Sequence, residues 1–186
     1  MEYREDIVAL LLEQHEQIKI LLHRVESTTG PQRREPFDDL VRVLAIHESA
    51  EAEVVHPAAR HASGEDALVE GRLEEESEAK QVLADLYEMG VEHPAFAAMF
   101  TDFAEAVREH AGIEEKEEFA ILRERLSDDQ RSRMAIAVRV AEAVAPTRPN
   151  PVEGDSPAAN VLAGPPLALF DRVRHAVRDW QHKTER

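Results

Sequence analysis

Apolar residues recur every three or four positions along most of this 186-residue chain, and this spacing constrains the fold more than any other feature. Steps of three and four place side chains along one face of an α-helix. Glycine and proline breaks near residues 28–31, 63–64 and 90–94 divide the pattern into four stretches. Helices of ~25 residues joined by short breaks predict an all-α fold, an antiparallel up-down-up-down four-helix bundle. The four apolar stripes lie within residues 8–25, 37–58, 69–86 and 96–121.

The C-terminal part of the chain has a different character. Residues 128–144 continue the helical pattern and predict a fifth helix. Six prolines then follow between residues 146 and 166, and they cannot lie in one helix. We therefore expect residues 1–145 to form the bundle with its fifth helix. Residues 146–186 are expected to form a proline-rich arm and a C-terminal helix, about 167–180, that packs back on the bundle.

Composition excludes several classes of function. The chain has no cysteine, which excludes disulfides, thiolate nucleophiles, iron–sulfur clusters and cysteine-type zinc sites. Its 38 Asp and Glu against 22 Lys and Arg give a formal net charge of -16, which disfavours nucleic acid and anionic membranes as partners. No apolar run approaches ~20 residues, and the N-terminus lacks a signal-peptide pattern. A cytoplasmic location is the resulting expectation.

Histidine or glutamate interrupts each of the four apolar stripes near its middle. Because antiparallel helices bring their midpoints to one level, we expect these side chains to converge in the core. Burying an unpaired carboxylate costs several kcal/mol, and neighbouring carboxylates also repel each other. A divalent or trivalent cation relieves both penalties. The six side chains are His15, His47, Glu51, Glu76, His110 and Glu114.

Two of these residue pairs have the spacing His-x-x-x-Glu, at His47/Glu51 and at His110/Glu114. That spacing places both side chains on one helical face, where they can hold one ion or a close pair of ions. Imidazole and carboxylate ligands without sulfur suit iron, manganese or zinc. A lone core histidine such as His15 can instead be hydrogen-bonded, so a metal-free helical interaction module stays an alternative. The acid runs are expected to be solvated faces; they include Glu74, Glu75, Glu78, Glu115 and Glu118.

These stretches resemble the hemerythrin-like, HHE cation-binding family. The matching segments lie at residues 6–18, 47–57 and 110–119, and the last two share one layout: His, then Glu four residues on, then a ring nine residues on. The resemblance covers about residues 4–126, and the proline-rich tail is similar to that of actinobacterial-type members. It implies two iron ions, oxo- or hydroxo-bridged, inside the bundle. Zinc or manganese are alternative metals.

The resemblance also implies the ligands. The first, second and fourth helices would each supply one histidine, and the glutamates of the two His-x-x-x-Glu pairs would bridge the ions. Glu76 stands where family members have a histidine in the third helix, and Glu48 is a further candidate beside His47. His56 is expected to pack near the site or to contact a ligand. The expected metal ligands are His15, His47, Glu48, Glu51, Glu76, His110 and Glu114.

Three histidines among many carboxylates favour ferric iron, whereas oxygen carriers of this family use five histidines. We therefore expect iron, oxygen or redox sensing or handling rather than oxygen transport. A di-iron enzyme acting on hydrogen peroxide or nitric oxide is the alternative, although no dedicated catalytic dyad is visible. The expected partners are a small ligand such as O2, peroxide or nitric oxide, and the expected oligomeric state is a monomer or homodimer.

Overall fold

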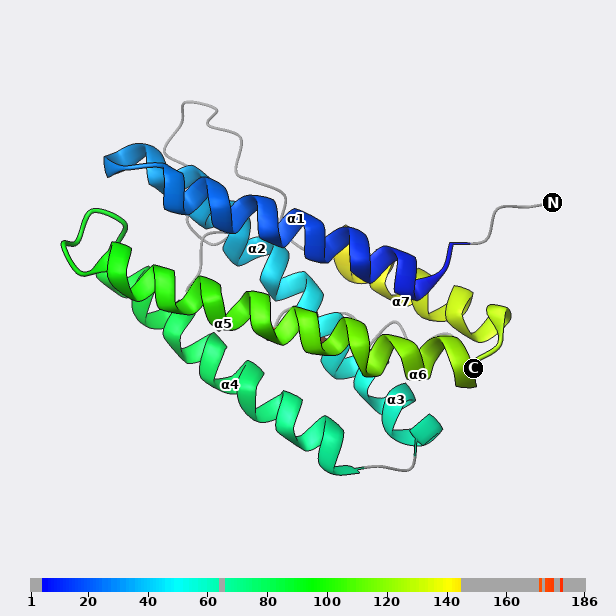
Figure 1. Ribbon diagram of the computed structural model, residues 1–186. Coiled ribbons are helices and arrows are strands. Elements are labelled where there is room, and N and C mark those ends of the chain that lie inside the picture. The colour runs from blue at the N-terminus through cyan, green and yellow to red at the C-terminus, as the bar shows by residue number, and fades with distance from the viewer. Residues whose placement is uncertain (1–4, 64–65, 145–170, 172, 176–177, 179–186) are drawn as a thin grey trace.

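The computed structural model describes residues 5–63, 66–144, 171, 173–175 and 178 (Figure 1). All regular structure within these residues is helical, which confirms the all-α expectation. A 3-10 turn at Gly30–Arg33 precedes α2, and a π-helical turn at Glu51–Val55 joins α2 to α3. The helices are α1 (Ile7–Ser27), α2 (Arg34–Ala50), α3 (His56–Ser63), α4 (Asp66–Met89), α5 (Phe96–Lys116), α6 (Glu118–Arg125) and α7 (Asp128–Val144).

Local sequence signals set several helix boundaries. The Asp6 carboxylate accepts a 2.9 Å hydrogen bond from the Val8 N–H and caps the start of α1. At the start of α7, the Ser127 N–H donates to the Gln130 side chain at 2.9 Å, a capping-box arrangement. Gly90 follows α4 with φ +81°, a conformation that favours glycine because a Cβ would strain it.

The helices pack in neighbouring pairs. α1 packs along α2 and α5, α4 packs along α5, and α3 packs on α6. Figure 1 shows α1, α4 and α5 running along the length of the molecule, and α7 contacts both α1 and α2. α7 therefore packs against two helices that carry candidate ligands.

Two buried apolar clusters flank the polar residues that interrupt the stripes. The larger cluster includes Ile18, Ile46 and Val107, and the smaller one includes Leu11 and Phe119. Along α1, along α2, and from α5 into α6, candidate ligands therefore lie between residues of one cluster and residues of the other. The apolar packing on both sides holds the polar layer in place.

The expected proline-rich arm, 146–166, lies outside the described residues, and the domain division at residue 145 stays a prediction. Within the expected C-terminal helix, Val173 is buried against the larger cluster. The guanidinium of Arg178 donates to Glu53 at 2.8 Å, within the π-helical turn. None of the helices in the described ranges is long and apolar enough to cross a bilayer.

Candidate metal centre

Six of the seven expected ligands lie together in the polar layer. Their donor atoms fall into two groups of four, and within each group the atoms lie within 4.8 Å of one another. Every member is buried except His110, which is half-buried. The first group is His15, His47, Glu51 and Glu114; the second is Glu51, Glu76, His110 and Glu114.

Glu51 and Glu114 belong to both groups. Glu51 is fully buried and Glu114 is 1% exposed, yet none of their four carboxylate oxygens accepts a hydrogen bond. Burial and the nearby charge of Glu114 raise the pKa of Glu51 well above its usual value. Buried polar groups are almost always hydrogen-bonded, so these oxygens are the atoms that a cation would satisfy.

The two histidines of the first group face each other, with 3.0 Å between the two Nε2 atoms. The Nδ1 of His15 lies 2.9 Å from a carboxylate oxygen of Glu115, so that Nδ1 carries a proton. The Nδ1 of His47 lies 3.0 Å from the Gln14 amide oxygen, and the amide orientation follows from the 2.8 Å bond that Gln14 Nε2 donates to Glu142.

Burial and the neighbouring His15 hold the pKa of His47 well below its usual value, so its ring is neutral. With its proton on Nδ1, the ring presents a lone pair at Nε2. The Nε2 of His15 therefore faces a lone pair. The contact is favourable when His15 Nε2 donates a proton to this lone pair, and a metal ion bound by both Nε2 atoms would take the place of that proton. Hydrogen bonding at Nδ1 is also the usual way in which proteins orient a metal-binding imidazole.

In the second group, His110 Nε2 lies 3.2 Å from a Glu114 oxygen without forming a hydrogen bond. Its Nδ1 lies 3.0 Å from Glu75 on α4. Burial lowers the pKa of His110, but Glu114 and Glu48 outweigh it and raise the pKa to about 10. The neighbouring carboxylates thus stabilise the protonated ring of His110, and a metal ion bound at Nε2 would take the place of its proton.

Glu76 is the candidate ligand whose carboxylate oxygens already contact two other side chains. One of its oxygens lies 2.5 Å from His56 Nε2 and the other accepts a 3.0 Å hydrogen bond from Lys80. His56 Nδ1 in turn lies 2.9 Å from Glu118 on α6. Burial lowers the pKa of His56, whereas its bonds to Glu118 and Glu76 raise it to about 10. His56 therefore contacts a candidate ligand rather than joining either group.

Glu48, the seventh expected ligand, lies outside both groups. It is 6% exposed, its Oε2 accepts no hydrogen bond, and Lys80 Nζ lies 3.5 Å from that oxygen. Burial and the charge of Glu76 raise the pKa of Glu48 to about 8. Its side chain lines a groove beside the centre instead.

The π-helical turn places Glu51. The His56 N–H donates to the Glu51 C=O five residues earlier, which widens the helix by one residue. Pro57 has no N–H and cannot continue the regular ladder, and such widened turns often occur at functional sites. The sequence pattern predicted one uninterrupted helix here and missed the turn, for which Pro57 was the available signal.

The residues that orient the ligands were also missed. Glu118 was expected on a solvated face, but it is fully buried against His56, so that expectation was wrong. Glu115 was expected there too, and it binds His15. Gln14 and Glu142 carried no sequence signal beyond the position of Gln14 beside His15. By contrast, Glu74 and Glu78 are exposed as expected.

The fold and the site define a helical protein with a buried layer of histidine and glutamate suited to binding metal. A family model described as "Hemerythrin HHE cation binding domain" matches residues 6–122, and the chain belongs to this family. A protein of Nostoc sp. strain PCC 7120 named "DNA nickase" is 30% identical over 129 residues, which cover 69% of this chain and 36% of that protein. No solved structure matches the chain.

Proposed function

We propose that α1, α2, α4 and α5 form an antiparallel four-helix bundle around a pair of iron ions, in a cytoplasmic protein of actinobacterial type. The observation that carries the proposal is that Glu51 and Glu114 belong to both ligand groups. Two adjacent cations repel strongly, and shared carboxylates between them reduce that repulsion. Their four oxygens accept no hydrogen bond, which leaves them free for this role.

Iron fits the donor set better than magnesium or calcium, because three imidazoles accompany the carboxylates. When bound, iron supplies one-electron chemistry with oxygen species. The excess of carboxylates favours ferric iron, and we therefore propose iron, oxygen or redox sensing or handling rather than reversible oxygen transport. The role of the protein is to orient the imidazoles through Glu115 and Gln14 and to hold the polar layer between the flanking apolar clusters.

Metal analysis of the purified protein tests the proposal. After anaerobic loading and exposure to air, we expect about two iron ions per chain and near-ultraviolet absorption from a ferric pair. Glu51→Gln should lose most of this iron, whereas Glu105→Gln, an exposed acid on the same helix as Glu114, should keep it. A wild-type chain that binds one ion, or none, would contradict the paired centre.

A di-iron enzyme acting on hydrogen peroxide or nitric oxide is the second candidate, and the groove that reaches His110 favours it because small molecules could approach the centre. The loaded protein should then consume many equivalents of peroxide per chain, and the metal-free protein should consume none. Consumption limited to about one equivalent per centre would exclude the enzyme.

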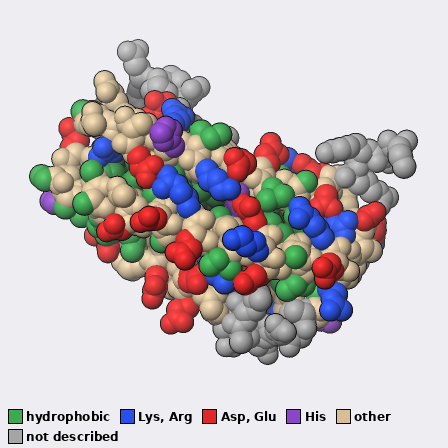
Figure 2. Space-filling model, viewed as in Figure 1, with side chains coloured by type: hydrophobic (Ala, Val, Ile, Leu, Met, Phe, Trp, Pro, Cys, Tyr) green, Lys and Arg blue, Asp and Glu red, His purple; other side chains and the backbone are tan. Residues whose placement is uncertain are grey.

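We do not extend DNA nicking from the named relative to this chain. The chain spans 36% of that protein, and a net charge of -16 opposes contact with a phosphate backbone. Figure 2 shows acidic side chains spread over the viewed face with Lys and Arg between them, rather than a basic patch. A metal-free interaction module, the third candidate, would follow from an absence of iron, zinc and manganese in the purified protein.

A further inference from the structure

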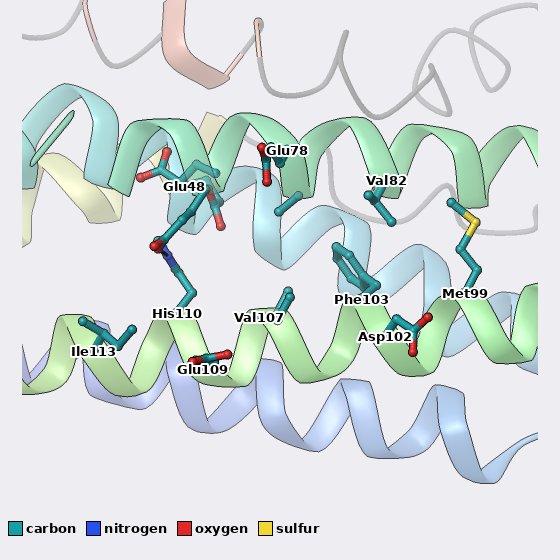
Figure 3. Close-up of a pocket in the computed structure, with 14 residues that line it drawn as sticks. Glu48, Glu78, Val82, Met99, Asp102, Phe103, Val107, Glu109, His110 and Ile113 are labelled. Carbon is teal, nitrogen blue, oxygen red and sulfur yellow. Dashed lines mark hydrogen bonds and ion pairs between the residues drawn. The ribbon is translucent and has the colours of Figure 1, made fainter. Parts of the chain in front are cut away.

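A groove of about 540 Å³ runs between α4 and α5 and ends at the candidate metal centre (Figure 3). Figure 3 shows Phe103, Val107 and His110 extending from α5 towards α4, with Glu48 behind them. The volume lies within the range of small-molecule sites and is far larger than a diatomic ligand or a metal ion requires.

Small side chains create the groove. Ala79 on α4 and Ala106 on α5 both line it, at positions where larger side chains would fill the space. Val82, Met99 and Phe103 extend the lining away from the metal centre, so most of the surface is apolar. An apolar wall of this length suits the hydrocarbon body of an organic ligand.

Every charged side chain that lines the groove, apart from His110, is acidic. Glu78, Asp102 and Glu109 are exposed acids at its edge, and in the part of the chain that the structure describes none of them pairs with a basic residue. At the inner end, Glu48 is 94% buried, its Oε2 accepts no hydrogen bond, and Lys80 Nζ lies 3.5 Å from that oxygen. Apolar walls with carboxylates at the edge and at the end complement a positively charged amphipathic molecule.

We propose that this groove binds a small organic amine, with the hydrocarbon body between α4 and α5 and the ammonium group paired with the lining carboxylates. The binding surface does not require a metal. That the amine approaches a metal centre rests on the proposed function, because His110 and Glu76 belong to both the groove and the second ligand group.

Three probes of equal chain length separate charge from apolar contact: hexylamine, hexan-1-ol and hexanoate. Two-dimensional NMR titrations of metal-free and iron-loaded protein should show shifts confined to α4, α5 and Glu48. We expect the Kd for hexylamine to be at least tenfold lower than that for hexanoate. Equal affinity for the amine and the acid, or no binding of the amine, would overturn the proposal.

Variants locate the site. Ala106→Phe should fill the groove and weaken hexylamine binding at least tenfold, whereas Ala98→Phe, an exposed site on α5 outside the groove, should not. The double variant Glu78→Gln and Asp102→Asn should weaken the binding of hexylamine and leave the binding of hexan-1-ol unchanged. Glu105→Gln is the charge control. Unchanged amine binding in both groove variants would refute the assigned site.

Iron content, measured on the same samples, keeps the two proposals apart. A wild-type chain that binds hexylamine but no metal would refute the proposed function and support the groove. A chain that binds iron but not hexylamine would refute only the groove. If the acidic variants slow iron loading and leave hexylamine binding unchanged, the acids serve metal entry and the amine proposal is wrong.

Discussion

Glu51 and Glu114 occupy the same buried layer, but their carboxyl groups respond to it in opposite ways. Burial and Glu114 raise the pKa of Glu51, whereas contacts with His110 and His15 overcome burial and hold the pKa of Glu114 below its usual value. Without a cation, the pair therefore favours one negative charge over two. A metal ion would release the proton from Glu51 and the one that His110 holds with a pKa of about 10, so metal affinity should rise with pH up to about 10.

Gln14 is the residue whose role is easiest to isolate, because it contacts His47 and not the proposed metal. Gln14→Leu removes the acceptor that fixes the His47 proton on Nδ1, and we expect a loss of about 10- to 100-fold in iron affinity. Gln17→Leu, exposed on the same helix, is the control. Competition with a chelator measures the affinity, and equal values for the two variants would contradict this role.

His56 gives the metal-free protein a pH dependence of known sign. Its pKa rises from the usual 6.5 to about 10 on folding, so its contribution to stability is fully present below pH 6.5 and is lost as the pH rises through 10. The difference in unfolding free energy between wild type and His56→Gln should be a few kcal/mol at pH 6 and shrink towards pH 10. Denaturant unfolding at several pH values measures it; a constant difference would show that His56 is neutral.

At the scale of the element, α1 depends on its N-cap residue, Asp6. Asp6 caps the helix and also pairs with Arg131 at 2.6 Å, from the first turn of α7. Asp6→Ala removes both contacts and should cost ~1 kcal/mol or somewhat more. Asp6→Asn keeps a capping oxygen and should cost less, because a partly exposed ion pair contributes little. Thermal unfolding ranks the variants, and equal losses would assign the whole effect to the ion pair.

The sequence predicts features that lie along one helix better than features that depend on packing between helices. The all-helical fold and the convergence of the six grouped side chains were predictable from the spacing of residues along the chain, whereas the turn at Glu51–Val55 was not. The relay from Glu142 through Gln14 to His47 was not, because it depends on α7 packing against α1. The burial of Glu118 depends in the same way on α3 packing on α6. Acids beside a stripe look alike in sequence whether a neighbouring helix covers them or not.

For the whole molecule, we expect the polar layer to lower the stability of the metal-free fold and metal binding to raise it. In the metal-free protein, the carboxylates of Glu51 and Glu114 are buried without hydrogen bonds between two apolar clusters. Metal that binds the folded state alone should stabilise it by about 4 kcal/mol when its free concentration is 1,000 times its Kd. Scanning calorimetry with and without chelator measures the change. The loss of this difference in Glu51→Gln, and its survival in Glu105→Gln, would localise it to the centre.

The widened turn at Glu51–Val55 also governs whether this centre can be moved to another scaffold. A designer who grafts His47, Glu51 and His56 onto an ordinary helix would rotate His56 by about 100° for the one residue that the turn absorbs. His56 would then point away from Glu76 and Glu118, and Glu76 would lose one of its two supports. A transplant should therefore carry the five-residue turn together with Pro57.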